Sequence, residues 1–343
     1  YWMFITTMGN INVLAGYFCV FVPVTMVLFC FCETIQSQVI YGVFMTVSFM
    51  GLISANGDAG ILGIGCAFLF LFWFCLVSFE KLKRFFLMAG LFFASAWVIG
   101  ALDDAYVDTV KEPLATLPGV IGKNMACHML AIVFLVLGFL FYFMKKKEVS
   151  EERLPMIRKI VYALIAVAAV AVFGGVIYLS TTGTDIDLGQ WETYLRFSDS
   201  WGSSRGFTWK RTLTIYAQDY TVFQKIFGYG PDLLGIPLHE RFHDEIFARM
   251  GAYLVDAHNE TLQTLGTLGI MGVIGYMGAQ ITALVRYAKC YKEDPFLLAV
   301  ATGLVAYIVQ GMMGSPQTFG TPIMFVALAM GESIVRRKKE EAA

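Results

Sequence analysis

Charged residues are scarce in this chain. Only 15% of its 343 residues are Asp, Glu, Lys or Arg, whereas 57% are hydrophobic and the mean hydropathy is +0.65. A soluble domain carries about 25% charged residues and could not bury this much apolar surface. The composition therefore excludes a soluble globular protein. Several runs reach the roughly 20 apolar residues that cross a bilayer, so we predict an all-α, polytopic membrane protein.

Other features are missing as well. The net charge of −1 shows no excess of either sign and says nothing about partners. For a membrane protein of this kind we expect no nucleic-acid partner. The seven cysteines lie in apolar runs or in basic loops, so no disulfide framework is implied. Neither a signal peptide nor a repeat of 20–50 residues is visible.

Nine apolar runs are present that could each span a membrane. The predicted spans are 11–31, 38–54, 60–79, 84–101, 122–144, 157–179, 260–285, 296–313 and 319–335. They divide the chain into an N-terminal bundle (1–179), a polar loop (180–257) and a C-terminal bundle with a tail (258–343). An odd number of spans and a first residue, Tyr1, that is not a start methionine lead us to expect further N-terminal spans in the natural protein.

Basic residues gather on one side of the predicted spans. They occupy three short connections and the tail: Lys81, Lys83, Arg84; Lys145, Lys146, Lys147, Arg153, Arg158, Lys159; Arg286, Lys289, Lys292; and Arg336, Arg337, Lys338, Lys339. The short connections on the other side hold only Lys111 and Lys123. The positive-inside rule places the first group in the cytoplasm and the polar loop outside.

The polar loop contains one helical pattern. Ser203 or Ser204 could cap a helix that runs to about Phe223. One face of this helix would carry Trp209, Leu213, Tyr216 and Tyr220, with Arg205 one turn before Trp209. Such a helix either lies along the membrane surface or packs over the outer end of the bundle.

His258 stands where the polar loop enters the apolar run that follows. Asp256 is a plausible N-cap, which would place His258 in the first turn, where the helix dipole disfavours imidazolium. A neutral imidazole is what a general base needs. The alternative is a histidine that only hydrogen-bonds at the interface. Asn259 and Gln263 share a face, and their amides could bind sugar or phosphate, or a neighbouring helix.

Cations of the polar loop are candidates for anion binding. Arg205 is the first choice, with Lys210 and Arg211 nearby. A guanidinium suits bidentate contact with phosphate, and a lipid phosphate or pyrophosphate is at hand near the outer leaflet. The alternative is a solvated arginine.

Three further patterns have weaker functional readings. Glycines recur every three residues at Gly266, Gly269, Gly272, Gly275 and Gly278, which favours close helix packing. His239 to His243 is a literal H-E-x-x-H, but charged Arg241 lies inside it and Pro237 two residues before it, and a zinc protease would need a third ligand. The D-x-D of Asp185 and Asp187 is too short to predict a metal site.

Four segments together resemble the O-antigen ligase and Wzy-type polymerase superfamily of bacterial membrane glycosyltransferases. Residues 9–17 resemble its G-N-x-N-x-L-A stretch, and Ser204, Arg205 and Trp209 resemble its S-x-R-x-x-x-W region. Residues 226–230 resemble its F-G-x-G stretch, and residues 257–263 resemble its A-H-N-x-x-L-Q motif. The order of the motifs and the long loop make the resemblance fairly specific.

The resemblance implies a metal-independent, inverting glycosyltransferase without a cofactor. Its donor would be a glycan on undecaprenyl pyrophosphate, and its acceptor another glycan or lipid-linked glycan. Arg205 matches the arginine thought to hold the pyrophosphate, and His258 the histidine proposed to activate the acceptor hydroxyl. The sequence does not separate polymerase from ligase, although we favour polymerase slightly.

One departure from the family concerns residues 54–60. Many members carry an arginine there, whereas this chain has none and places Asp58 in the stretch. Arg211 or Lys210 could replace it at the phosphate, with Trp209 beside them, and Asp58 could contact the acceptor sugar.

The competing function classes are a transporter or flippase of lipid-linked sugars, and a membrane zinc protease. Spans nearly free of charge favour chemistry at the outer rim over transport.

Overall fold

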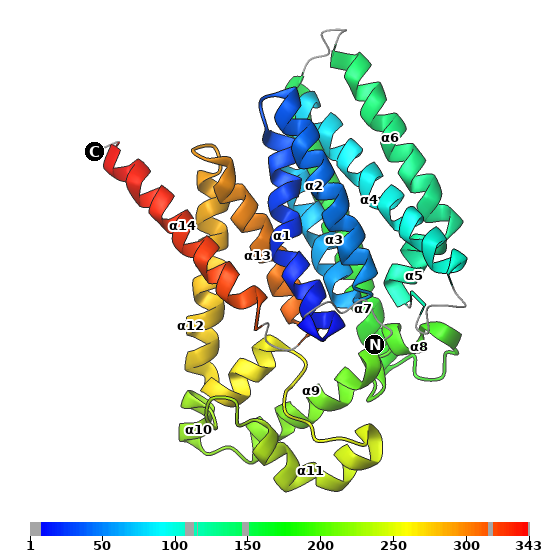
Figure 1. The fold of residues 1–343 in the computed structure, drawn as a ribbon. Helices are drawn as coiled ribbons and strands as arrows, with labels where there is room; N and C mark the ends of the chain where they lie inside the picture. Colours follow the sequence, from blue (N-terminus) through cyan, green and yellow to red (C-terminus); the bar gives the residue numbers. More distant parts are fainter. Residues whose placement is uncertain (1–7, 107–112, 115, 146–150, 315–317, 342–343) are drawn as a thin grey trace. The chain divides into compact units, whose positions relative to one another are not determined.

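The computed structural model describes residues 8–106, 113–114, 116–145, 151–314 and 318–341, and its regular structure in these ranges is all helical (Figure 1). The α-helices are α1 (Ile11–Phe31), α2 (Ile35–Ser54), α3 (Asp58–Cys75), α4 (Phe79–Ala105), α5 (Thr116–Lys123), α6 (Met125–Lys145), α7 (Leu154–Thr181), α8 (Glu192–Leu195), α9 (Trp201–Gln218), α10 (Val222–Phe227), α11 (Gly235–Met250), α12 (Glu260–Cys290), α13 (Pro295–Gly311) and α14 (Gly320–Glu341). The predicted fold class is confirmed. Tyr1, Lys111, Lys146 and Lys147, on which parts of the topology prediction rest, lie outside the described ranges.

Six described helices are long and apolar enough to cross a membrane: α1, α2, α3, α4, α7 and α12. The pair α5 and α6, bent by 63°, makes a seventh if it counts as one span. The last two predicted spans are helices of another kind. Helix α13 has only 17 residues, and α14 carries Glu332 and the basic residues near its end. Hydropathy alone therefore counted nine spans because it did not weigh helix length or the charged end of α14.

The chain folds into two compact units. Unit 1 comprises Tyr1–Arg158, Gln280–Gln310 and Gln317–Ala343; unit 2 comprises Lys159–Ala279 and Gly311–Pro316. Helix α12 contributes its first part to unit 2 and its last part to unit 1.

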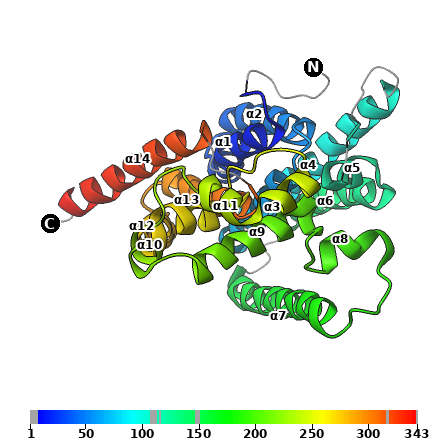
Figure 2. The same cartoon turned by 90° about the horizontal axis from the view of Figure 1, so that it is seen from below.

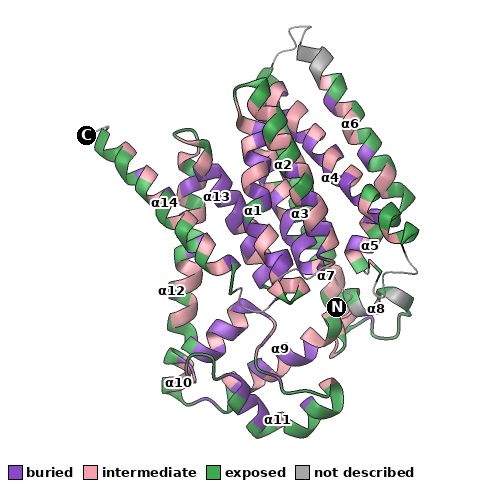
Figure 3. Ribbon diagram, viewed as in Figure 1, coloured by how far each residue is buried: buried purple, intermediate pink, exposed green. Residues whose placement is uncertain are grey.

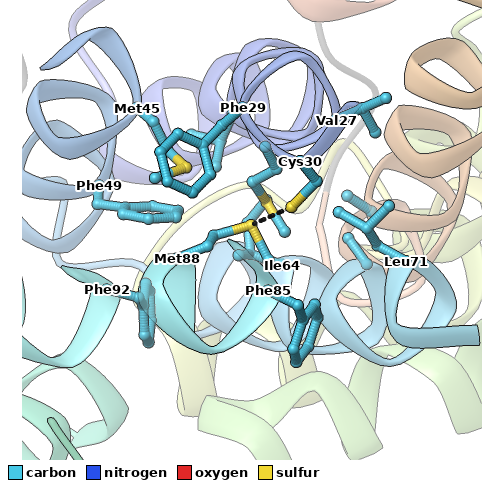
Figure 4. Close-up of a cluster of buried hydrophobic side chains, with 14 of the residues drawn as sticks. Val27, Phe29, Cys30, Met45, Phe49, Ile64, Leu71, Phe85, Met88 and Phe92 are labelled. Atoms are coloured by element: carbon cyan, nitrogen blue, oxygen red, sulfur yellow. Dashed lines mark hydrogen bonds between the residues drawn. The ribbon is translucent and has the colours of Figure 1, made fainter. Parts of the chain in front are cut away.

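The core of unit 1 is built from aromatic and sulfur-containing side chains of α1 to α4. Phe49 meets Phe92 edge to face at 5.2 Å between ring centroids, and Cys30 Sγ lies 3.9 Å from Met88 Sδ (Figure 4). Glycines let α4 approach α6, since Gly90 and Gly138 each lie against a leucine of the other helix. The outward faces of these helices carry many exposed apolar side chains, as expected where lipid is the solvent.

The polar loop has a hydrophobic core of its own within unit 2. Helices α9 and α11, which lie next to one another (Figures 1 and 2), supply most of it, and both carry buried positions (Figure 3). Its fully or nearly buried members are Phe207, Ile215, Tyr220, Leu234, Leu238, Ile246, Leu254 and Ala257. The loop is therefore a folded element that can hold side chains in fixed positions.

The predicted loop helix is confirmed only in its middle. Residues 202–204 have left-handed backbone angles, so regular helix begins after Ser204, and α9 ends at Gln218. Thr221 then starts α10 with a capping box to Gln224. The predicted face was also wrong in part, because Leu213 is 47% exposed while Phe207, Thr208, Thr212 and Ile215 form the buried stripe.

Candidate active site

His258 lies just outside the first turn of α12. Asn259 is the N-cap: its side-chain oxygen accepts the Leu262 N–H (3.0 Å), and its carbonyl accepts the Gln263 N–H (2.8 Å). The expectation that Asp256 caps the helix was wrong. His258 instead has a φ of +47°, a left-handed conformation that is costly for a residue with a side chain. Strain of this kind is common where a side chain must be aimed at a functional site.

Asp256 forms a pair with His258. Its Oδ1 accepts the His258 backbone N–H at 2.7 Å and lies 2.8 Å from the imidazole Nδ1. A carboxylate at Nδ1 favours the tautomer that carries its proton there, so that Nε2 is the acceptor nitrogen. The side chain of His258 is 44% exposed and that of Asp256 20% exposed. The arrangement is that of a general base with an orienting carboxylate.

The amides of Asn259 and Gln263 hold this loop in place. Gln263 Oε1 accepts the Ala257 N–H at 3.0 Å, and Asn259 Nδ2 donates to the Met312 carbonyl at 2.9 Å. Both side chains belong to residues only 6% exposed. The structure therefore places both amides, which we expected to bind substrate, in bonds that shape the loop around His258.

Arg205 is tied to the same segment of chain as Asn259. Its Nε donates to the Met313 carbonyl (2.7 Å), and its Nη1 to the Gly202 carbonyl (2.7 Å). The carbonyl of Met312 thus holds Asn259, the residue after His258, and the next carbonyl, that of Met313, holds the Arg205 guanidinium. Sequence analysis could not have found this contact, because it joins residues 108 positions apart.

The other two predicted anion-binding cations, Lys210 and Arg211, are paired with carboxylates. Lys210 Nζ lies 2.9 Å from Asp199, and Arg211 Nη2 lies 2.6 Å from Glu245 and 3.7 Å from Asp199. The hydrogen bond from Lys210 lowers the pKa of Asp199, although partial burial opposes the shift. These ion pairs leave less positive charge for an anion than the sequence suggested.

Trp209 lies in an aromatic group at the start of α9. Its ring is 5.1 Å from Trp201 and 6.2 Å from Phe197, measured between centroids. Its indole Nε1 is shielded from solvent and has no hydrogen-bond partner among the described residues.

Asp58 belongs to unit 1 and begins α3 there. Its Oδ1 accepts hydrogen bonds from Thr116 Oγ1 and from the Leu117 N–H, the latter at 3.0 Å. The carboxylate thus fastens the first turn of α5 to α3.

The H-E-x-x-H residues lie on α11, as that motif requires, but their imidazoles face one another. His239 Nδ1 is 3.4 Å from His243 Nδ1, while His239 Nε2 accepts the Leu254 N–H at 2.9 Å. The ring of His239 also stacks on Tyr253 at 3.6 Å. Both nitrogens of His239 therefore have protein partners, and no group of three metal-ligating side chains occurs in the described part of the chain.

The row of glycines in α12 contains a break that the sequence did not predict. Gly269 has φ +68° and ψ −169°, so the helix is interrupted there. The Phe227–Gly230 stretch fits against the break: Tyr229 N–H donates to the Gly266 carbonyl (3.0 Å), and Gly230 N–H to the Thr267 carbonyl (3.1 Å). A Cβ on Gly269 would lie 2.3 Å from the Ile226 carbonyl oxygen. The reading of all five glycines as helix-packing positions was therefore incomplete, and Gly275 and Gly278 have no neighbour at Cβ distance.

Fold and site together define a class: a helical, multi-pass membrane protein with a folded polar loop that presents a His–Asp pair and an anchored arginine. Residues 119–277 match the family model described as O-Antigen ligase. This match supports the resemblance of the chain to the O-antigen ligase and Wzy-type polymerase superfamily. The matched residues run from α5 into α12 and include both Arg205 and His258. A comparison with curated proteins found no match.

Proposed function

We propose that this protein transfers a glycan from undecaprenyl pyrophosphate to an acceptor hydroxyl at the outer face of the bacterial inner membrane. The family match supports a ligase-type glycosyltransferase acting on lipid-linked glycans. The observation that carries the proposal is the Asp256–His258 pair, joined to Arg205 through the carbonyls of Met312 and Met313.

His258 is the general base of the proposed reaction. Its Nε2 takes the proton from the acceptor hydroxyl, whose oxygen attacks the anomeric carbon of the donor. The bond between that carbon and the pyrophosphate oxygen breaks with inversion, which leaves undecaprenyl pyrophosphate. Asp256 keeps Nε2 as the accepting nitrogen and stabilises the imidazolium that forms.

Arg205 stabilises the leaving pyrophosphate. The carbonyls of Met313 and Gly202 accept hydrogen bonds from its guanidinium and orient it. Negative charge grows on the pyrophosphate as the glycosidic bond breaks, and a cation fixed in advance lowers the energy of that transition state. The proposal assigns this role to a guanidinium and calls for no metal ion.

Positioning roles follow for the nearby residues. Asn259 and Gln263 set the path of the loop that carries His258. Trp209 supplies an aromatic surface beside Arg205, since the two are one turn apart on α9. The ion pairs of Lys210 and Arg211 make them secondary contacts to the donor, and Asp58 acts through the packing of α5 on α3. Ligation and polymerisation use the same steps and differ in the acceptor.

The test replaces His258 by alanine in membranes supplied with lipid-linked glycan. We expect loss of ligated or polymerised product by a factor of at least about 10² while the amount of protein in the membrane is unchanged. The matched control is His243→Ala, since His243 lies in the same loop and contacts His239 and Phe247 on α11. Full activity of His258→Ala would overturn the assignment.

A second variant separates donor binding from proton transfer. We expect Arg205→Ala to lower kcat/KM for the donor by about 10²–10³. Arg241→Ala is the control, because Arg241 pairs with Asp219 elsewhere on the loop. Donor dependence equal to that of the unchanged protein would remove Arg205 from the pyrophosphate role.

A further inference from the structure

Unit 1 contains a cationic site of its own. Two adjoining cavities, of about 560 and 370 Å³, share Val77, Tyr291 and Lys292 in their walls. The larger is lined in part by Trp73, Phe74, Arg158 and Lys289, and the smaller by Phe31 and Lys81. These residues come from the ends of α1, α3, α4 and α12 and the start of α7, in the connections that the positive-inside rule assigns to the cytoplasm.

Among the residues that the structure describes, no carboxylate pairs with the cations of this cleft. No ion pair in the described part of the chain includes Lys81, Arg158, Lys289 or Lys292, whereas Lys83 and Arg84 beside them are paired with Glu80. Two of the four lie over aromatic rings instead: the Arg158 guanidinium is 4.3 Å from the Trp73 ring centroid, and Lys81 Nζ is 4.3 Å from that of Phe31.

Arg158 gives the strongest indication of a missing ligand. Its Nε is shielded from solvent and has no hydrogen-bond partner among the described residues. A buried guanidinium N–H without an acceptor is costly, because its hydrogen bond to water has been lost and no other hydrogen bond replaces it. An anionic oxygen in the cleft would satisfy it, and Lys289 and Lys292 would add charge on the same wall.

An apolar track leads away from the cations. Ile281 and Val285 are 51% and 46% exposed and lie four residues apart on α12, with Lys289 four residues further on. Residues at this spacing share a helix face, so one stripe passes from apolar side chains to a cation. An acyl chain fits the first part of the stripe and a phosphate the second.

We propose that this cleft binds the phosphate headgroup of an anionic phospholipid of the cytoplasmic leaflet. Unpaired cations, an unsatisfied guanidinium N–H and an apolar track ending at Lys289 all match a lipid with a phosphodiester head. Basic pockets between membrane helices on the cytoplasmic side recognise such headgroups. The site is separate from Arg205 and His258 and does not depend on the proposed reaction.

Native mass spectrometry of the purified protein tests this inference, with phosphatidylglycerol and phosphatidylcholine of equal chain length as probes. We expect the protein to retain phosphatidylglycerol in preference. Each neutralised cation is expected to weaken binding about fivefold, since one cation near a membrane surface contributes about 1 kcal/mol and a tenfold step in affinity corresponds to about 1.4 kcal/mol. The triple variant Arg158→Gln/Lys289→Gln/Lys292→Gln is therefore expected to bind about a hundredfold more weakly.

The matched control removes the same charge from α14. Arg336, Arg337 and Lys338 are paired with Glu332 or Glu341, so Arg336→Gln/Arg337→Gln/Lys338→Gln should leave lipid binding nearly unchanged. Equal losses in the two triple variants, or equal retention of the two lipids, would overturn the proposal. Displacement of the lipid by glycerol phosphate at the same concentration would show that the site takes a free phosphate instead. The single variant Arg158→Gln, expected to show the fivefold loss, keeps the test decisive if the triple variant does not fold.

Discussion

The backbone of His258 shows how a single residue's conformation decides what its side chain can do. The φ of +47° turns the chain back so that both its N–H and its Nδ1 reach Asp256. The next residue, Asn259, then caps α12 by accepting the Leu262 N–H with its side-chain oxygen. A base held in this way is ready before substrate binds, which is how a fixed site lowers the cost of reaching the transition state.

His239 makes the stability of the polar loop depend on pH. Burial, followed by the nearby His243, lowers the pKa of His239 from its ordinary value of 6.5. The unfolded chain therefore takes up a proton near pH 6.5, whereas the folded chain does so only at lower pH, and the free energy of unfolding falls as pH drops below 6.5. We expect a lower thermal midpoint at about pH 5.5 than at about pH 7.5.

The control for this effect is His239→Gln. Glutamine does not titrate, and its Oε1 can still accept the Leu254 N–H that His239 Nε2 accepts. Its thermal midpoint should therefore fall less on acidification. An equal fall in both proteins would show that other groups cause the pH dependence.

Patterns in the sequence single out candidate residues but do not reveal the contacts that these residues make. His258 stands out because a polar loop meets an apolar run there, and Arg205 because it precedes Trp209 by one turn. The partner of His258 was missed, although Asp256 is only two positions away, because its role depends on a left-handed φ that no pattern revealed. The Met312–Met313 anchor was missed because tertiary folding alone brings it to Arg205.

At the scale of helices, the break in α12 is the most specific feature. Gly228 and Gly269 both have positive φ and face one another's backbone, so neither position has room for a side chain. The contact joins the stretch after α10 to the helix that follows His258. It thus connects the folded loop to the membrane helix that begins at the proposed site.

We predict that Gly269→Ala destabilises unit 2. The new Cβ would lie 2.3 Å from the Ile226 carbonyl oxygen, and the backbone angles are nearly restricted to glycine, so a loss of at least about 1–3 kcal/mol is expected. Gly275→Ala is the control, because its Cβ would meet no atom within 4 Å and stability should be unchanged or raised by up to about 1 kcal/mol. Unfolding of both variants in detergent measures the difference, and equal stability would contradict this account of the break.

Helix ends were harder to predict than helices. Hydropathy located the spans, but the capping box at Thr221 started a new helix where periodicity extended the old one. The left-handed turn at 202–204 likewise has no periodic signal. Local hydrogen bonds decide such ends, and they compete with a pattern that only reports which face is apolar.

For the whole molecule, the distribution of charge predicts an orientation. Lys292 and its basic neighbours should face the cytoplasm and Asp185 of the polar loop the exterior. A cysteine placed at Asp185 should react with a membrane-impermeant maleimide in right-side-out vesicles, and one at Lys292 only after permeabilisation. The unsubstituted protein, with its seven cysteines, gives the background. The opposite labelling would reverse the topology and move His258 to the wrong side for an outer-leaflet donor.

The central claim is that Asp256 and His258 act together as the base for glycan transfer. The most direct measurement is a double-mutant cycle on the rate of transfer from a lipid-linked glycan, using Asp256→Asn, His258→Gln and the combined variant in reconstituted vesicles. We predict that Asp256→Asn slows transfer by about 10²–10⁴ and that the combined variant is no slower than His258→Gln alone, because a carboxylate that works through the imidazole has no effect once the imidazole is gone. Losses that multiply in the combined variant, or an unchanged rate in either single variant, would contradict the claim.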